Sequence, residues 1–227
     1  MAGNLPQEVE AYLEEIVKRL TEYLQHQLVG IYLFGSASYG AYESGLSDLD
    51  VQAIVTDRLS TVEKQAVISR LTHAALPCPA TKLEFVPDHI SLDPANESSH
   101  WFLLDIAMGR QLGRSLCGPD PTHAFGAIPQ RWILEAIADS LDWHHENELS
   151  SPNSILNACR GWQFIVTGEF SSKSDGAKWA LQQQDCPDVV RRAILARNTG
   201  DKLPAAQARM LYDIVMTANR AKLATDI

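Results

Sequence analysis

The stretch LFGSASYG at residues 33–40, followed by SDLDV at residues 47–51, carries the clearest chemical signal in this chain. The apolar run from Val29 to Phe34 is typical of a buried strand, and it ends abruptly at Gly35 and Ser36. Because glycine has no Cβ atom, backbone N–H groups at such a junction can approach a phosphate closely. The junction is therefore predicted to bind phosphate.

Two carboxylates one residue apart follow this turn, at Asp48 and Asp50, and apolar residues continue to Val55. The segment is predicted to be a strand, so both aspartates should point to the same face of it. Carboxylate oxygens are good ligands for hard cations such as Mg²⁺. The pair is a candidate metal site beside the phosphate-binding turn. The alternative, a surface loop between two core strands, leaves the Gly-Ser pair unexplained.

This pattern, an apolar strand, Gly-Ser, ten residues and then Ser-Asp-x-Asp, resembles the signature of the polymerase-β-like nucleotidyltransferase superfamily. The resemblance implies a nucleoside triphosphate, two magnesium ions and in-line transfer of a nucleotidyl group. It also implies that Gly35, Ser36 and Ser47 hold the phosphates, whereas Asp48 and Asp50 bind the metal ions.

A third acidic residue follows on the next predicted strand. Residues 81–86 (TKLEFV) alternate in polarity and are closed by Pro87. In nucleotidyltransferases of this type, a third carboxylate lies on the strand next to the Asp-x-Asp strand. The resemblance therefore implies that Glu84 either completes the metal shell or accepts the proton of the acceptor hydroxyl. The alternative is an exposed strand glutamate without a role.

Composition limits the classes of protein that this chain can represent. With 227 residues, 45% hydrophobic and 21% charged, it can bury a sizeable core and form two modest domains. Its net charge of -9 argues against a nucleic-acid partner, because phosphate neutralisation requires clustered Lys and Arg. A cationic small molecule suits this balance better.

No signal peptide or membrane span is evident, because no apolar stretch reaches the roughly 18 residues that a span needs. We therefore expect a cytoplasmic protein without membrane contact, acting as a monomer. The cysteines are Cys78, Cys117, Cys159 and Cys186. They form no CxxC pair and are expected to be reduced. The histidines His89, His100, His144 and His145 show no metal-ligand spacing and are expected at the surface or in loops.

Secondary-structure signals divide the chain near residue 127. Helices are predicted over residues 6–27, 62–74 and 101–110, and strands over residues 29–34, 48–55 and 81–86. Glycine and proline are dense from residue 116 to residue 129. Beyond this point helices are predicted over residues 131–148, 152–168, 174–183, 187–197 and 204–222. The predicted fold is an α/β domain with a small mixed sheet and flanking helices, residues 1–127, followed by an all-α helical-bundle domain, residues 128–227.

The second predicted domain carries a more specific resemblance. The segments SILNACRGW (154–162), TGEFSSK (167–173) and AKWAL (177–181) resemble the helical domain of the aminoglycoside adenylyltransferases, in particular the streptomycin/spectinomycin 3''-(9) group. The resemblance implies that Arg160 and Lys173 bind the triphosphate and that the helical domain closes the nucleotide and acceptor cleft. Without it, the two side chains would be interpreted as an arginine on a packed helix and a lysine at a solvated loop end.

The resemblance is less close at the acceptor site. Streptomycin-modifying members are expected to present a Trp and an Asp where this chain has Leu141 and Glu146, and a further acidic position holds Ser150. These departures put streptomycin in doubt and leave spectinomycin or another aminocyclitol open.

The candidate acceptor residues are Trp101, Trp143, Glu146 and Glu148. The two carboxylates could neutralise an amino or guanidino group, or be solvated charges near a helix end. Trp101 is either core or one wall of the acceptor site.

Taken together, the residues and the resemblance predict an enzyme that transfers AMP from ATP, with two Mg²⁺ ions, to a hydroxyl of an aminoglycoside or aminocyclitol antibiotic. Two alternatives stay open. One is a nucleotidyltransferase with a protein or RNA acceptor, and the other is a non-catalytic nucleotide-binding module. A panel of acceptors incubated with ATP and Mg²⁺ would separate these three hypotheses.

Overall fold

The structure is a computed structural model that describes residues 5–71, 91–93 and 98–225. The chain divides into two compact units. The N-terminal unit comprises Met1–Ser98 and Asp105–Ala127, and the C-terminal unit comprises Ser99–Leu104 and Ile128–Ile227. Helix α4 (Ser99–Leu112) therefore contributes its first turns to one unit and its last turns to the other.

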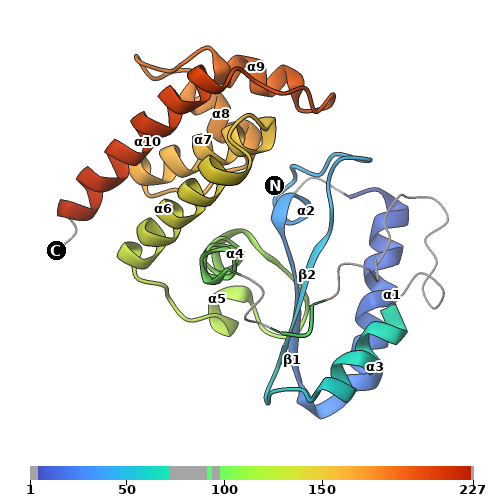
Figure 1. The fold of residues 1–227 in the computed structure, drawn as a ribbon. Helices are drawn as coiled ribbons and strands as arrows, with labels where there is room; N and C mark the ends of the chain where they lie inside the picture. The colour runs from blue at the N-terminus through green and yellow to red at the C-terminus, as the bar shows by residue number, and fades with distance from the viewer. Residues whose placement is uncertain (1–4, 72–90, 94–97, 226–227) are drawn as a thin grey trace. The chain divides into compact units, whose positions relative to one another are not determined.

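A three-stranded sheet forms the centre of the N-terminal unit (Figure 1). Strand β1 (Leu28–Phe34) lies between β2 (Asp50–Val55) and β3 (Arg114–Cys117), and both pairings are antiparallel. The sequence did not predict β3, which is short and follows α4 after the single residue Gly113. The strand predicted over residues 81–86 lies outside the described residues.

Strand β1 is buried because helices cover both of its faces. Ile31 and Leu33 pack on one side against α1 (Gln7–Leu24), and α3 (Thr61–Leu71) joins the cluster around Ile31. Tyr32 and Phe34 alternate to the other side, where they meet Phe125, which follows α5 (Pro121–Ala124), and Ile106 of α4. Because successive side chains of a strand point to opposite faces, the apolar residues of β1 pack alternately against the helices on one face and on the other.

The N-terminal unit also contains short elements at the ends of α1 and β1. The turn η1 (Gln25–Gln27) connects α1 to β1, and α2 (Gly35–Ser38) follows β1 directly. An ion pair ties α1 to the edge of the sheet. The Arg114 guanidinium on β3 donates to both carboxylate oxygens of Glu10, at 2.7 and 2.8 Å.

The C-terminal unit contains the helices α6 (Gln130–Asn147), α7 (Pro152–Thr167), α8 (Lys173–Ala180), α9 (Val189–Ala196) and α10 (Ala205–Thr225). Helix α7 packs against each of the other four (Figure 1). It starts with Pro152 in its first turn and ends at Gly168, whose left-handed backbone (φ 77°) suits glycine. The prediction of an α/β unit followed by a helical unit is confirmed. Within the described ranges, no helix is long and apolar enough to cross a membrane.

Candidate active site

The phosphate-binding turn and the carboxylates predicted from the sequence meet at one end of the sheet in the N-terminal unit. Asp50, the first residue of β2, pairs with Phe34, the last residue of β1, so Gly35 follows directly beside Asp50. Gly35 has a φ of +61°, and a Cβ atom added there would overlap the Asp50 carboxylate. Only glycine combines this backbone conformation with the space for the carboxylate.

The two aspartates are both exposed, and their neighbours explain why. Leu49 and Val51 pack against the cluster of apolar residues that includes Leu33, so the residues alternating with them point away from it. Strand β2 begins at Asp50 rather than at Asp48, two residues later than predicted. Asp48 lacks a strand partner because β1 has ended at Phe34 and continues as α2.

The loop that leads to Asp48 is held by its own hydrogen bonds. The Ser47 hydroxyl accepts from the Glu43 backbone N–H at 3.0 Å, and the Ser47 N–H donates to the Glu43 carbonyl at 2.9 Å. Ser38 similarly donates to the Gly35 carbonyl at 2.8 Å and holds the turn of α2. Because the Ser47 hydroxyl acts as an acceptor here, its own proton can still be donated to a phosphate oxygen.

The described residues supply two of the three predicted metal ligands. Asp48 and Asp50 offer exposed carboxylate oxygens beside the Gly35 turn, the donor chemistry that Mg²⁺ prefers. Glu84 lies outside the described residues, and the part of the chain that is described contains no group of three or more His, Cys, Asp or Glu arranged to hold a metal ion. The residues present therefore fit a magnesium site that needs further oxygen ligands.

The two predicted phosphate-binding cations lie at the packed start of α8 in the C-terminal unit. Gly176 of α8 lies against Arg160 of α7, and a Cβ added there would be 2.6 Å from the Arg160 Cα. The Ser172 hydroxyl caps α8 by accepting from the Asp175 N–H at 2.9 Å. Lys173 is the first residue of α8, and its ammonium donates to Oδ1 of Asn153 at 2.6 Å.

Three of the four predicted acceptor residues are brought together in the C-terminal unit. Trp101 and Trp143 contact each other edge to face, with ring centroids 5.6 Å apart. Each also packs against the imidazole of His144, at 5.2 and 5.1 Å. Glu148 follows α6 and reaches His144, with Oε2 3.4 Å from Nδ1. Glu146 is exposed and makes no hydrogen bond or ion pair with the described residues.

The prediction that His100 and His144 lie at the surface or in loops is wrong, because both are buried residues of helices, α4 and α6. Their exposed fractions are 9% and 4%, respectively. His144 is one helical turn from Leu141 and two from Ile137 on the buried face of α6, and this spacing could have revealed it.

His144 is the centre of a buried polar network. Its Nδ1 lies 3.0 Å from the Ser154 hydroxyl, and its Nε2 lies 3.1 Å from the Asn157 amide nitrogen. Burial lowers the pKa of His144, while the Glu148 carboxylate raises it and the charges of Lys173 and Arg160 lower it further. The ring is therefore neutral at physiological pH, with one donor and one acceptor nitrogen.

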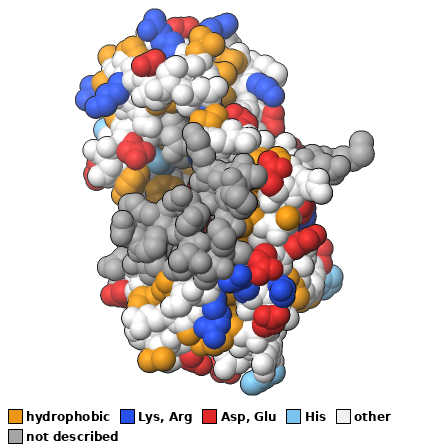
Figure 2. Space-filling view, turned by 90° about the vertical axis from the view of Figure 1, so that its right-hand side faces the viewer, with side chains coloured by type: hydrophobic (Ala, Val, Ile, Leu, Met, Phe, Trp, Pro, Cys, Tyr) orange, Lys and Arg blue, Asp and Glu red, His pale blue; other side chains and the backbone are white. Residues whose placement is uncertain are grey.

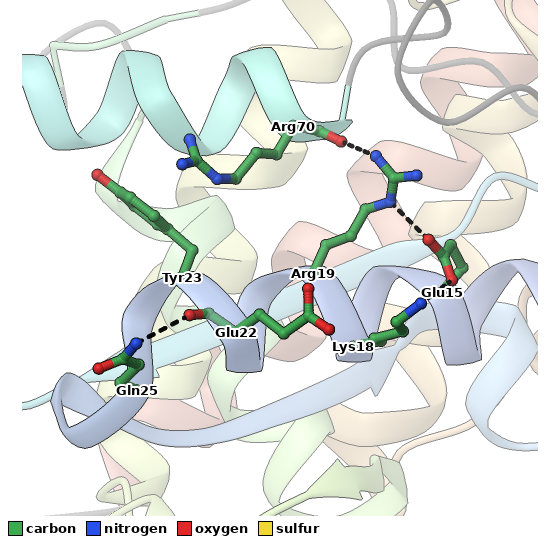
Figure 3. Close-up of a pocket in the computed structure, with 7 residues that line it drawn as sticks. All are labelled: Glu15, Lys18, Arg19, Glu22, Tyr23, Gln25 and Arg70. Carbon is green, nitrogen blue, oxygen red and sulfur yellow. Dashed lines mark hydrogen bonds and ion pairs between the residues drawn. The ribbon is translucent and has the colours of Figure 1, made fainter.

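An open pocket on α1 and α3 contains none of the predicted site residues (Figure 3). Its side chains are already engaged with one another. Arg19 donates to Glu15 at 2.8 Å and to the Arg70 carbonyl at 3.0 Å, and the Arg70 guanidinium lies 4.0 Å above the Tyr23 ring. Acidic and basic side chains are interspersed on this side of the N-terminal unit (Figure 2). The mixed charge and mutual pairing make this pocket a poor triphosphate site.

The Gly35 turn and the two aspartates predict a nucleotidyltransferase, and the similarity of the chain to known proteins bears on this prediction. Residues 123–212 match the family model described as aminoglycoside adenylyltransferase, C-terminal domain. The chain is 29% identical to a spectinomycin 9-adenylyltransferase of Staphylococcus aureus, with 79% of each chain covered. It is 23% identical to an aminoglycoside (3'') (9) adenylyltransferase of Shigella flexneri, covering 78% of this chain and 79% of the relative.

A solved structure has the same fold. It is the spectinomycin adenyltransferase AAD(9) of Enterococcus faecialis with ATP and spectinomycin. The TM-score is 0.68 at 18% identity, with 93% of this chain and 99% of that chain covered. Together, these matches confirm the prediction that the chain is an enzyme of the nucleotidyltransferase class. More particularly, they support an aminoglycoside adenylyltransferase.

Proposed function

We propose that this protein transfers AMP from ATP to a hydroxyl group of an aminoglycoside or aminocyclitol antibiotic and releases pyrophosphate, which would make it a resistance enzyme. The observation that carries this proposal is the position of Gly35 directly beside the exposed Asp50 carboxylate. A phosphate-binding turn next to a carboxylate pair is what nucleotidyl transfer requires. The names of the relatives supply the acceptor class.

In the N-terminal unit, Asp48 and Asp50 would hold two Mg²⁺ ions. When bound, magnesium neutralises phosphate charge and polarises the α-phosphorus for attack. The backbone N–H groups of Gly35 and Ser36 and the hydroxyl of Ser47 would bind phosphate oxygens. Glu84, which lies outside the described residues, would accept the proton of the acceptor hydroxyl or serve as a further metal ligand.

Arg160 and Lys173 of the C-terminal unit would bind the remaining phosphate charge. Charge-assisted hydrogen bonds from a guanidinium or an ammonium to phosphate are stronger than neutral ones. The hydrogen bond to Asn153 already orients the Lys173 ammonium, so less rotamer freedom is lost when a phosphate binds.

Trp101, Trp143 and Glu148 would form the acceptor site, with Glu146 on the same helix end. Indole rings provide apolar walls and attract cations through their faces, and a carboxylate pairs with an ammonium group. Leu141, which stands where streptomycin-modifying members carry Trp, is 4% exposed and faces the helical core. We therefore favour spectinomycin or another aminocyclitol over streptomycin as the acceptor.

The cellular setting is part of the same proposal. ATP and free Mg²⁺ are supplied in the cytoplasm, where we place the enzyme as a monomer that needs no membrane or nucleic acid. A net charge of -9 suits attraction of a cationic antibiotic.

The proposal is tested by incubating the purified protein with ATP, Mg²⁺ and a panel of aminoglycosides and aminocyclitols while pyrophosphate is measured. We expect release that depends on an added antibiotic, with spectinomycin more effective than streptomycin. Release that requires an added protein or RNA would favour a macromolecular acceptor. ATP binding without pyrophosphate release under any condition would indicate a non-catalytic module.

A further inference from the structure

The polar network in the C-terminal unit has a consistent order of donors and acceptors. The Asn157 amide nitrogen lies 3.1 Å from Nε2 of His144, and the Ser154 hydroxyl lies 3.0 Å from Nδ1. The Ser154 hydroxyl also donates to Oε2 of Glu148 at 3.3 Å. If Nε2 accepts from Asn157, then Nδ1–H donates to Ser154, and the Ser154 proton remains for Glu148. Both ring nitrogens of His144, the Ser154 hydroxyl and Oε2 of Glu148 then each have a partner, whereas the buried Oδ1 of Asn157 has none among the described residues.

Glu148 is fixed at only one of its oxygens. Its side chain is 42% exposed, and Oε2 is contacted by both Ser154 and His144. Among the described residues, Oε1 has no hydrogen-bond partner. A glutamate at an exposed helix end would otherwise sample many rotamers, and ordering it on binding costs free energy.

We propose that His144 is a positioning residue of the acceptor site. It packs against Trp101 and Trp143 and is supported by Asn157. Through Ser154 it fixes Oε2 of Glu148, which leaves Oε1 to bind an ammonium or guanidinium group of the acceptor. This inference rests on the proposed function, which makes Glu148 an acceptor carboxylate. It adds that the preorganisation of Glu148 is set by a buried imidazole.

The surroundings of His144 agree with this role. Burial lowers its pKa, so the ring stays neutral and keeps the acceptor nitrogen that Asn157 needs. The charged groups that act on it are Glu148 of α6, Arg160 of α7 and Lys173 of α8. Protonation would place an N–H at Nε2 against the Asn157 N–H and break the order of the network.

The first test is a double-mutant cycle read out as acceptor KM. We expect Glu148→Gln to raise the KM for spectinomycin about tenfold, the size expected for losing a charged hydrogen bond, with little change in the KM for ATP. His144→Ala should raise the acceptor KM by a similar factor, and the double variant should be no worse than the larger single effect. The proposal would be overturned if the double variant raised the acceptor KM by the product of the two single effects, or if the variants raised only the KM for ATP.

Two further variants keep the test informative if His144→Ala folds poorly. His144→Asn places an amide nitrogen near the position of Nδ1 and should recover part of the acceptor affinity. Ser154→Ala removes the bridging hydroxyl from a fully buried position without adding volume and should raise the acceptor KM severalfold. The matched control is His145→Asn, because His145 is exposed and its ring contacts Tyr212 instead. A rise in the acceptor KM of His145→Asn as large as that of His144→Ala would contradict the assignment.

The second test needs no acceptor and therefore separates this inference from the proposed function. The pKa of His144, measured by NMR titration, should fall in Glu148→Gln, because the carboxylate raises it in the wild type. An unchanged pKa would overturn the coupling even in an active enzyme. A fall in pKa with no antibiotic-dependent pyrophosphate release would instead support the coupling and overturn the proposed function.

Discussion

The carboxylate site of the N-terminal unit and the His144 network of the C-terminal unit differ in how their residues are brought together. Gly35 is the first residue of α2, Asp48 lies in the loop before β2, and Asp50 is the first residue of β2; both aspartates are exposed. The C-terminal site draws on α4, α6, α7 and α8, and its central imidazole is buried. The first site is a local motif, whereas the second exists only when the helices pack.

This difference indicates how each site should respond to substitution. Removing an exposed carboxylate changes the chemistry of the site and leaves the apolar core intact, because neither aspartate belongs to that core. Changing a residue in the helical network alters packing and hydrogen bonding together. Variants in the N-terminal site should therefore separate activity from stability, and variants in the C-terminal site should couple them.

The largest expected effect is at the aspartate pair. Asp48→Asn or Asp50→Asn should lower turnover more than about 100-fold. Substituting a residue that only supports a metal ligand already lowers metal affinity or activity roughly 10–100-fold, and a direct ligand should matter more. The free energy of unfolding should stay close to that of the wild type. The control is Asp57→Asn, an exposed aspartate just beyond the other end of β2. Near wild-type turnover in either variant at ordinary Mg²⁺ concentrations would refute the metal assignment.

The next effect distinguishes two roles of Glu84. If Glu84 is the general base, Glu84→Gln should lower the rate of the chemical step by roughly 10²–10⁴ and leave ATP and acceptor binding nearly unchanged. If Glu84 is instead a metal ligand, the same substitution should weaken Mg²⁺ binding, and a high Mg²⁺ concentration should restore part of the rate. We expect the base role, and a Mg²⁺ titration of Glu84→Gln decides between them.

A smaller effect is expected where α8 packs on α7. Gly176→Ala places a methyl group against the Arg160 backbone and should destabilise the protein by about 1–3 kcal/mol, as overpacking does. Because Arg160 and Lys173 lie at this contact, the KM for ATP should rise as well. Gly126→Ala is the control, since nothing lies within 4 Å of an added Cβ there. Unchanged stability in Gly176→Ala would contradict the coupling expected of the C-terminal site.

The smallest expected effect is a difference in how the two units respond to acid. Burial keeps the pKa of His144 below its usual 6.5, so the unfolded chain binds more protons and the C-terminal unit loses stability as pH falls below about 6.5. The hydrogen bond from Arg114 lowers the pKa of Glu10 from 4.5. The N-terminal unit therefore starts to lose stability only when the pH falls to about 4.5, and it loses more as the pH falls further. Hydrogen exchange at pH 5.5 should therefore show faster opening of α6 and α7 than at pH 7, with β1 unchanged.

The same contrast explains what could be predicted from the sequence. The Gly-Ser turn and the Asp-x-Asp pair are visible because their residues are close in sequence and alternate with core residues such as Leu49 and Val51. Helix α6 was also predictable from its apolar periodicity. The contact between Trp101 and Trp143 was not, because it depends on two helices far apart in the chain.

Other features were missed for physical reasons of the same kind. Strand β3 is formed by four residues whose place in the sheet comes from pairing with β1, not from their own propensity. His144 looked like a polar residue at a helix end, yet Ser154 and Asn157 of the next helix satisfy its nitrogens and allow its burial. Partners from another element cannot be identified from local spacing.

The central claim is that this chain transfers a nucleotidyl group from ATP to a small cationic acceptor. The most direct test follows the label from two preparations of ATP, one labelled at the α-phosphorus and one at the γ-phosphorus, incubated with the protein, Mg²⁺ and spectinomycin. We predict that the α-label appears in the antibiotic and the γ-label in pyrophosphate, and that Asp50→Asn abolishes both. Transfer of the γ-label to the antibiotic, or no label in any acceptor of the panel, would contradict the claim.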